Sequence, residues 1–253
     1  EEWFNNLLSR SKNVPCDFNI LSKKEARELH PFMDFDQARI IVNTPNDGHV
    51  DPSSVVMTMS QLAKEKGATI SRFNRVLEIN NQPNGEWEVI TEKGTFIAEH
   101  VVNAAGCFAP EVGAMVGAKL PIINLEHQYL ITEDHPVLKE LDYELPVCRD
   151  SYCSSYLRQE GQGLLIGPYE TFGAKPWALE GMNWDFDRGL FPDDLERLMP
   201  FLDRCMERMP IFSEVGVKTV INGPITHTPD DNILAGPQMG LRNFWNLCGS
   251  SIG

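Results

Sequence analysis

The chain has 253 residues, of which 42% are hydrophobic and 9% aromatic, enough for one large domain or two small ones with a hydrophobic core. Its formal net charge of −14 argues against nucleic acid and against anionic membrane surfaces as partners. No apolar run approaches the ~18 residues of a membrane span, and the amino-terminal residues lack the pattern of a signal peptide.

The six cysteines indicate a reducing compartment. None belongs to a Cys-x-x-Cys pair, and no histidine stands beside them at the spacing of zinc ligands. Several lie in apolar runs, where a thiol behaves as a small buried hydrophobic group. We therefore expect reduced thiols in a cytoplasmic protein, or in a mitochondrial-matrix protein if the source is eukaryotic, with no disulfide framework or metal site. The cysteines are Cys16, Cys107, Cys148, Cys153, Cys205 and Cys248.

The amino-terminal part of the chain is predicted to be helical. Residues 1–13 have the apolar spacing of the end of an amphipathic helix. The run Ser22-Lys23-Lys24-Glu25 is a capping box, which opens a short helix that must end before Pro31. Because the first residues continue a helical pattern and lack a methionine, we expect the chain to be an internal piece of a larger protein.

A longer helix is predicted from Pro52 to about Lys66. Asp51 is its expected N-cap, proline suits its first turn, and Gly67 supplies the left-handed residue that ends it. An apolar stripe runs along one side and consists of Val55, Val56, Met59, Leu62 and Ala63.

Short strands follow this helix. Turn sequences at residues 80–85 and at Lys93-Gly94 separate them, and a short helix is predicted over residues 109–116. The order helix, strand, three-stranded meander, strand is typical of the second half of a flavin-type nucleotide-binding domain. The predicted strands are residues 68–71, 75–79, 87–91, 96–98 and 101–103.

The rest of the chain is predicted to be rich in strands, apart from a helix formed by residues 192–201 and the following turn to Met209, with Asp193 and Asp194 near its amino end. The predicted fold class is therefore mixed α/β (α+β). It combines part of a Rossmann-like, flavin-type domain, without its N-terminal βαβ unit, and a β-rich substrate domain. The predicted strands are residues 122–125, 128–132, 155–159, 164–169, 215–222 and 243–247, with a turn at residues 228–231.

Two strand ends with glycine indicate a dinucleotide-type cofactor site. Strand 101–103 runs into Ala104-Ala105-Gly106, where a Cβ on residue 106 would block a close neighbour, and the aromatic run 244–248 leads into Gly249 and Gly253. Bare backbone at such ends approaches phosphates or cofactor rings, although tight turns without a ligand explain either glycine alone equally well. The opening Gly-x-Gly-x-x-Gly fingerprint does not occur in the sequence, which again favours an internal piece of an enzyme.

Among the polar side chains, His127 and Tyr129 are expected on one face of a strand and Gln128 on the other. Two polar rings on one face can line a substrate pocket. Alternatively, Tyr129 is a half-buried sheet residue and His127 a surface residue, and the residues alone favour this second interpretation.

Other candidates are weaker. Tyr156 and Arg158 share a strand face, and Arg149 and Arg158 are candidate carboxylate clamps, although an arginine at a sheet edge is more often only solvated. His227 is a pocket candidate in a predicted turn, where an ordinary turn residue is the more common outcome. The sequence contains no Gly-x-Ser-x-Gly, phosphate-binding Walker loop or His-Glu-x-x-His, which weakens hydrolase and kinase interpretations.

Several sequence runs together resemble a known family, the D-amino-acid-oxidase-like flavoproteins. Three of them are Asp47-Gly48-His49-Val50-Asp51-Pro52, Arg75-Val76-Leu77-Glu78-Ile79 and Val101-Val102-Asn103-Ala104-Ala105-Gly106. The resemblance is closest to its dimethylglycine and sarcosine dehydrogenase branch, and together the runs span essentially the whole chain. The branch-specific runs are Glu126-His127-Gln128-Tyr129, Ser155-Tyr156-Leu157-Arg158-Gln159-Glu160, Gly167-Pro168-Tyr169-Glu170 and residues 222–230.

The resemblance implies FAD as the cofactor and a small methylated glycine as the substrate. Hydride would leave the N-methyl carbon for flavin N5, and the iminium product would be hydrolysed or passed to tetrahydrofolate. It also implies a domain plan. Residues 1–120 would form part of the FAD-binding domain together with some substrate-domain elements, residues 121–225 the β-rich substrate-binding domain, and residues 226–253 a return to the FAD-binding domain. The electron acceptor is not identified by the sequence.

The resemblance also assigns roles to single residues. Tyr129 would hydrogen-bond the substrate carboxylate or shape the pocket, and His127 would accept the amine proton, which reverses the interpretation from the residues alone. Tyr156, Arg158 and His227 are further substrate-binding candidates. The implied cofactor contacts are Val76, Ala105, Gly106, Phe108, Gly249, Ser250, Ser251, Ile252 and Gly253.

The chain departs from the family pattern in one place. Relatives that oxidise free amino acids carry an arginine just before the Thr-Pro-Asp turn, where this chain has Ile225, and this puts carboxylate binding by that route in doubt. The FAD fingerprint, and the histidine that carries covalent flavin in eukaryotic relatives, would precede Glu1. A folate-binding region would follow Gly253, so tetrahydrofolate would act only through that further region.

Two alternatives remain open. The first is an oxidase of the same fold that passes electrons to oxygen, or that acts on another secondary amine. The second is a non-catalytic, flavoprotein-like binding subunit or fragment. A flavin spectrum that substrate bleaches separates the enzymes from the second alternative, and peroxide release separates an oxidase from a dehydrogenase.

Overall fold

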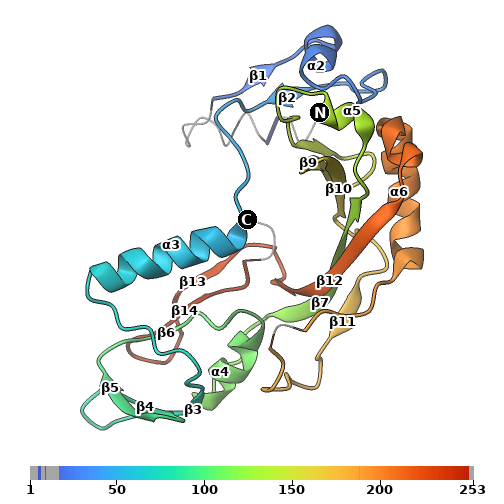
Figure 1. Cartoon of the computed structure of the whole chain (residues 1–253). Helices are drawn as coiled ribbons and strands as arrows, with labels where there is room; N and C mark the ends of the chain where they lie inside the picture. Colours follow the sequence, from blue (N-terminus) through green and yellow to red (C-terminus); the bar gives the residue numbers. More distant parts are fainter. Residues whose placement is uncertain (1–4, 7–8, 10–16, 188, 251–253) are drawn as a thin grey trace. The chain divides into compact units, whose positions relative to one another are not determined.

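The structure is a computed structural model that describes residues 5–6, 9, 17–187 and 189–250 (Figure 1). The predicted amino-terminal helix over residues 1–13 and the expected cofactor residues Ser251, Ile252 and Gly253 lie largely or wholly outside these ranges. Among the described helices, none has both the length and the apolar character needed to cross a membrane.

The chain divides into two compact units, and each is described by itself. The first unit contains Glu1–Val55, Gln128–Phe172 and Asp193–Ile221, and the second contains Val56–His127, Gly173–Pro192 and Asn222–Gly253. The predicted mixed α/β class is confirmed, since helices and several separate sheets are present. The predicted domain boundaries near residues 120 and 225 concern the whole protein and stay a prediction.

The first unit begins with a small antiparallel pair, β1 (Asn19–Ile20) and β2 (Val42–Asn43), around helix α2 (Lys23–Leu29). The predicted capping box is confirmed: the Ser22 hydroxyl accepts from the Glu25 N–H at 3.2 Å, and the Ser22 N–H donates to the Glu25 carboxylate at 2.8 Å. Both bonds satisfy N–H groups that a helix start leaves without intrahelical partners.

Within this unit the main sheet has the order β7–β10–β9–β8, and β12 (Val217–His227) also pairs with β7. Two separate strands were predicted where the structure has one, β7, because side-chain burial alternates without a break through the polar residues Glu126 and His127. The strands are β7 (Ile123–Thr132), β8 (Cys148–Asp150), β9 (Ser155–Glu160) and β10 (Gly163–Pro168), and short helix α5 (Pro136–Lys139) follows β7.

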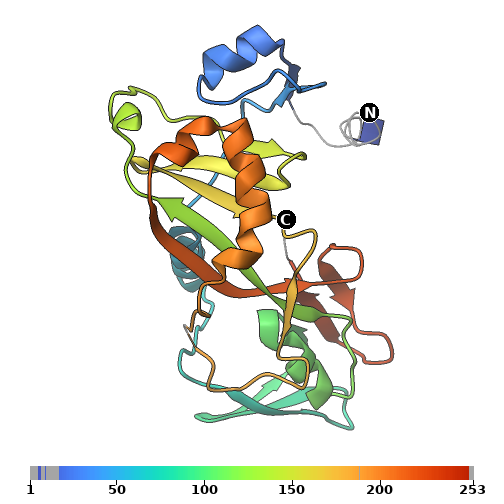
Figure 2. The same cartoon turned by 90° about the vertical axis from the view of Figure 1, so that its right-hand side faces the viewer.

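Helix α6 (Leu195–Arg208) covers one face of this sheet (Figures 1 and 2). Its buried residues Leu198, Phe201, Leu202 and Cys205 repeat at helical spacing and face the sheet. The predicted helical stretch from Pro192 to Met209 is confirmed at its carboxyl end, where Met209 is the C-cap, and corrected at its start, because Asp194 is the N-cap. The 3₁₀ turn η2 (Pro210–Glu214) follows it and leads to strand β12 (Val217–His227).

The second unit holds two three-stranded sheets. One is the predicted meander, in the order β3–β4–β5, and the other has the order β13–β14–β6. In the second sheet β14 lies parallel to β6 and antiparallel to β13. The strands are β3 (Val76–Asn81), β4 (Trp87–Thr91), β5 (Gly94–Ala98), β6 (Val101–Asn103), β13 (Leu234–Pro237) and β14 (Phe244–Cys248), followed after β6 by η1 (Gly106–Phe108) and α4 (Ala109–Met115).

Three expectations for this part of the chain are corrected. Residues 68–71, all of them described, form no strand, and two short strands that the sequence did not predict are present, β11 (Lys175–Trp177) and β13. Both unpredicted strands are only three or four residues long, too short to show a clear alternating pattern. β11 pairs with β7, and β13 pairs with β14. Local pattern carries no signal for such pairing.

Helix α3 (Pro52–Glu65) forms where predicted, with the Asp51 carboxylate accepting from the Ser54 N–H at 2.7 Å and Gly67 in the left-handed region. Its apolar stripe is not covered in the described part of the chain, since none of its residues is buried and Val56, Met59 and Leu62 are 64%, 66% and 50% exposed.

His30, the residue that ends α2, is a buried titratable group. It is 2% exposed, and its Nδ1 atom has no hydrogen-bond partner among the described residues. Burial lowers the pKa of this imidazole from 6.5 to about 4, so the folded protein keeps it neutral.

This burial predicts a specific acid sensitivity. The unfolded chain protonates His30 below about pH 6.5, whereas the folded chain does so only near pH 4, and stability is therefore lost as the pH falls through this window. The shift corresponds to roughly 3 kcal/mol. Urea unfolding at pH 7 and pH 4.5 should show a smaller loss for His30→Leu than for the wild type. His100→Leu, at an exposed histidine, is the control, and equal losses in all three proteins would contradict the prediction.

The register of the main sheet creates a second sensitive position. Gly167 on β10 pairs with Tyr156 on β9, and a Cβ at residue 167 would collide with the Tyr156 ring. Gly167→Ala should therefore displace that ring and lower the free energy of unfolding by about 1–3 kcal/mol. Gly48→Ala is the matched control, because its Cβ would meet nothing within 4 Å. Equal stabilities of the two variants would show that the ring moves away without cost.

Candidate functional site

The candidate catalytic residues lie on strand β7. Burial alternates along it: Gln128 is 0% exposed, whereas His127 and Tyr129 are half-buried on the opposite face, as the sequence predicts for a strand. The boundary between the two compact units falls between His127 and Gln128. Tyr129 therefore belongs with the main sheet of the first unit.

The first unit brings several tyrosines and an arginine together. The rings of Tyr156 and Tyr169 have centroids 5.8 Å apart, and the Arg149 guanidinium carbon lies 5.6 Å from the Tyr169 ring centroid. Arg149 on β8 pairs with Tyr156 on β9. We call Tyr129, Arg149, Tyr156 and Tyr169 the tyrosine cluster.

Burial favours the protonated hydroxyls of Tyr156 and Tyr169. Burial raises the pKa of Tyr156, and the neighbouring Tyr169 and Tyr129 raise it further, whereas Arg158 and Arg149 lower it. Burial also raises the pKa of Tyr169, and Arg149 opposes this. A protonated phenol donates a hydrogen bond, and the Tyr169 hydroxyl has no protein partner among the described residues. The cluster therefore offers phenolic donors beside a cation, which is a suitable environment for a carboxylate.

The two arginines proposed as clamps differ in the structure. Arg158 donates to the Gln159 carbonyl at 3.2 Å and forms an ion pair with Glu160 at 2.5 Å. Arg149 forms no ion pair with another described residue, and its guanidinium lies over the Tyr169 ring. The arrangement makes Arg149 the better placed clamp, although the register that puts it beside Tyr156 is not visible in the sequence.

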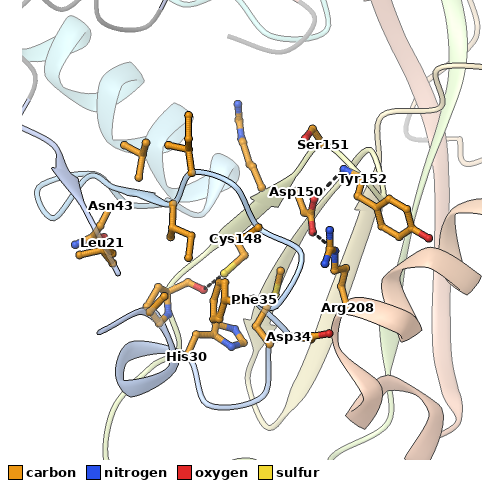
Figure 3. Close-up of a pocket in the computed structure, with 18 of the residues that line it drawn as sticks. Leu21, His30, Asp34, Phe35, Asn43, Cys148, Asp150, Ser151, Tyr152 and Arg208 are labelled. Atoms are coloured by element: carbon orange, nitrogen blue, oxygen red, sulfur yellow. Dashed lines mark hydrogen bonds and ion pairs between the residues drawn. The ribbon is translucent and has the colours of Figure 1, made fainter. Parts of the chain in front are cut away.

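A cavity of about 810 Å³ adjoins the cluster (Figure 3). Residues 21–43 supply a largely apolar wall, with Leu21 and Phe35, and the segment after Leu145 supplies a polar one that includes Arg149 and Tyr169. Asp150 and Arg208 on the polar wall form an ion pair at 2.8 Å, so this second arginine is already neutralised. The cavity lies within the first unit and is large enough to admit a small amino acid.

His227 differs from its predicted context. It is the last residue of strand β12 and not part of a turn, because the strand continues five residues beyond its predicted end at Asn222. Its Nδ1 lies 2.9 Å from the Asp231 carboxylate. Both His227 and His127 are assigned to the second unit, and the tyrosine cluster is assigned to the first.

The described cofactor candidates other than Val76 lie at one sheet edge of the second unit. Because β6 and β14 are parallel, their carboxyl ends lie at the same edge, and these ends lead into Gly106 and Gly249. Ala105 and Phe108 belong to the turn after β6, and Phe108 stacks on Trp184 with centroids 5.2 Å apart. Ser250 follows β14, and Val76 begins β3.

The two glycines are required for different reasons. A Cβ on Gly106 would meet nothing within 4 Å, so the expected close protein neighbour is absent among the described residues, and its φ of +58° is what favours glycine. The open space beside Gly106 fits a cofactor that approaches the backbone. At Gly249 a Cβ would lie 2.6 Å from Cγ2 of Thr228, and φ is +75°. The edge therefore fits a dinucleotide at the carboxyl ends of parallel strands.

Comparisons with known proteins identify relatives over nearly the whole chain. Residues 1–252 match the family described as FAD dependent oxidoreductase. Dimethylglycine dehydrogenase from mouse mitochondria is 38% identical over 238 residues, which cover 92% of this chain and 27% of the relative. Mouse mitochondrial sarcosine dehydrogenase is 31% identical over 251 residues, which cover 97% of this chain and 27% of the relative.

The fold comparison agrees with this result. The structure of L-proline dehydrogenase from P. horikoshii superposes with a TM-score of 0.80 at 23% identity, covering 98% of this chain and 63% of that chain. The chain spans only about 27% of the length of the two dehydrogenases that it matches. From the match over residues 1–252, the chain belongs to the family of FAD dependent oxidoreductases, which confirms the resemblance that the sequence runs predicted.

Proposed function

We propose that the protein to which this chain belongs catalyses FAD-dependent oxidative N-demethylation of a methylated glycine, such as dimethylglycine or sarcosine. The tyrosine cluster carries the proposal, because it offers a small carboxylate phenolic donors and a guanidinium that has no ion pair among the described residues. The similarity to dimethylglycine dehydrogenase and sarcosine dehydrogenase supports the choice of substrate.

In this proposal the residues that bind the substrate carboxylate belong to the first unit. Arg149 pairs with the substrate carboxylate, and the hydroxyls of Tyr129 and Tyr169 donate hydrogen bonds to it. Arg149 would thus take the role of the carboxylate-binding arginine of the family pattern, whose position is occupied by Ile225 in this chain. Holding the carboxylate at fixed points limits the orientations of the amine, which lowers the entropic part of the barrier.

The amine must be unprotonated before its N-methyl group can be oxidised, since a protonated amine has no lone pair to stabilise the iminium product. His127 shares its strand face with Tyr129 and is the proposed acceptor of the amine proton. FAD, held by the edge that contains Gly106 and Gly249, supplies the acceptor for the hydride from the N-methyl carbon. Val76, Ala105, Phe108 and Ser250 are the other described residues proposed to contact it.

The first test is an anaerobic absorbance titration of the complete parent polypeptide with dimethylglycine, then sarcosine, then a D-amino acid. We expect a bound flavin whose absorbance is bleached by a methylated glycine. A flavin that none of the three compounds bleaches would contradict the substrate class, and a protein without flavin would contradict the enzyme assignment. Oxygen uptake with peroxide release would assign the oxidase alternative.

A substitution tests the carboxylate clamp. Arg149→Met should raise KM for the methylated glycine about 10- to 100-fold, the loss expected from a charged hydrogen bond worth ~1.5–3 kcal/mol. Steady-state kinetics of the full polypeptide measure this. Arg72→Met is the control, since Arg72 lies over the Phe73 ring in the second unit and is expected to leave KM unchanged. An unchanged KM for Arg149→Met would remove Arg149 from the site.

A further inference from the structure

Behind the half-buried face of β7 lies a closed ring of polar contacts among Gln128, Glu170, Asp194 and Arg197, which we call the polar ring. The side-chain amide of Gln128 accepts from the Asp194 N–H at 2.8 Å and donates to the Asp194 carbonyl at 3.2 Å. The Asp194 carboxylate accepts from the Arg197 N–H at 3.2 Å as the N-cap of α6. Arg197 Nε lies 2.7 Å from Glu170 Oε1.

The main chain of β7 closes the ring. The N–H of Gln128 donates to Glu170 Oε2 at 3.3 Å. This bond falls between Glu126, the last residue of β7 that pairs with β11, and Leu130, the first that pairs with β10. At this point of the strand a side-chain carboxylate takes the place of a neighbouring strand as the acceptor of a backbone N–H.

The ion pair in the ring is deeply buried. The side chains of Arg197 and Glu170 are 8% and 4% exposed. Two charges lose their hydration in such a place, and apolar side chains of similar volume often stabilise a protein as well or better. Stability alone therefore does not account for a buried pair at this position.

The position of the polar ring, behind the strand that carries His127 and Tyr129, gives a reason for the buried ion pair. Gln128 stands between His127 and Tyr129, so a shift of its main chain moves both rings on the opposite face. Glu170 directly follows Tyr169, another member of the tyrosine cluster, whose N–H is held by the Ser154 carbonyl at 2.7 Å. The same short segment therefore supplies one residue to the cluster and the next to the ring behind it.

We propose that Glu170 and Arg197 are positioning residues, which fix the main chain of β7 at Gln128 and thereby the placement of Tyr129 toward the substrate. This inference rests on the proposed function of Tyr129. A misplacement of about 1 Å in a reacting geometry can cost on the order of 100-fold in rate, and the ring restrains the strand at the residue where such a shift would arise.

Two double variants of the complete polypeptide separate positioning from charge. In Glu170→Leu with Arg197→Met, both charges and the acceptor for the Gln128 N–H are removed. In Glu170→Gln with Arg197→Met, the charges are removed but an amide oxygen remains as the acceptor. Neither variant leaves one member of the Glu170–Arg197 pair buried without the other, which would itself destabilise the fold. Lys24→Met with Glu28→Gln, at an exposed pair on α2, is the control.

The first readout is the rate of anaerobic flavin bleaching at saturating methylated glycine, with the melting temperature measured beside it. We expect the leucine variant to lose about 10-fold or more in this rate, and the glutamine variant and the control to stay within about threefold of the wild type. The glutamine variant and the control should melt close to the wild type, and the leucine variant somewhat lower, because the buried Gln128 N–H loses its acceptor. A folded leucine variant that bleaches at the wild-type rate would overturn the proposal, as would equal losses in both double variants.

The second readout needs no substrate and separates this proposal from the proposed function. Hydrogen exchange measured by mass spectrometry should accelerate in peptides from β7 in the leucine variant, and remain unchanged in peptides from β14. If no methylated glycine bleaches the wild-type flavin, the proposed function fails, and exchange still decides whether the ring holds β7. Unchanged exchange in β7 would overturn the proposal in either case.

Discussion

The structure depends on one constraint, the hydrogen-bonding needs of the buried face of β7. Asn124, Glu126 and Gln128 are 6%, 8% and 0% exposed, and a buried polar group without a partner costs roughly 1–3 kcal/mol. Each finds its partner in a segment distant in sequence. Asn124 donates to the Cys107 carbonyl at 2.9 Å, and Glu126 pairs with Lys175 at 3.0 Å. Gln128 makes its two bonds to the main chain of Asp194, the residue that caps α6.

The same constraint orders segments that would otherwise have little to hold them. Strand β11 is three residues long, yet Lys175 at its start anchors it to Glu126. Asn222 within β12 donates to Glu126 at 3.3 Å and to the Pro192 carbonyl at 2.8 Å, which ties the loop before α6 to the strand. The hydrogen bonds of these polar side chains are directional. They therefore fix the positions of the segments around β7 more specifically than apolar contacts would. These contacts occupy the buried face of β7, and His127 and Tyr129 lie on its opposite face.

The sequence predicts what local pattern determines. The meander strand Trp87–Thr91, the strand Val101–Asn103 and the Ser22 capping box are confirmed, because alternation, turn residues and capping chemistry act over a few neighbours. The prediction is wrong at β7, where the polar residues Glu126 and His127 indicated a gap between two strands and the structure continues one strand through them. At the candidate site, the sequence predicts that His127 and Tyr129 share a face, because successive side chains of a strand point to opposite faces. The approach of Arg149 and Tyr169 to Tyr156 depends on strand register, which no local signal specifies.

Strand register also explains how the short segment after β10 contributes both to the tyrosine cluster and to the polar ring. In Gly167-Pro168-Tyr169-Glu170, the glycine leaves room for the Tyr156 ring, and the tyrosine ring lies tilted against that ring. The glutamate binds the backbone of β7 and the guanidinium of Arg197. A shift of one residue would place a charged group among the phenols and a phenol beside the buried arginine. Because Glu170 can form its ion pair in only one register, the polar ring that supports Tyr129 also specifies how β10 aligns with its neighbours.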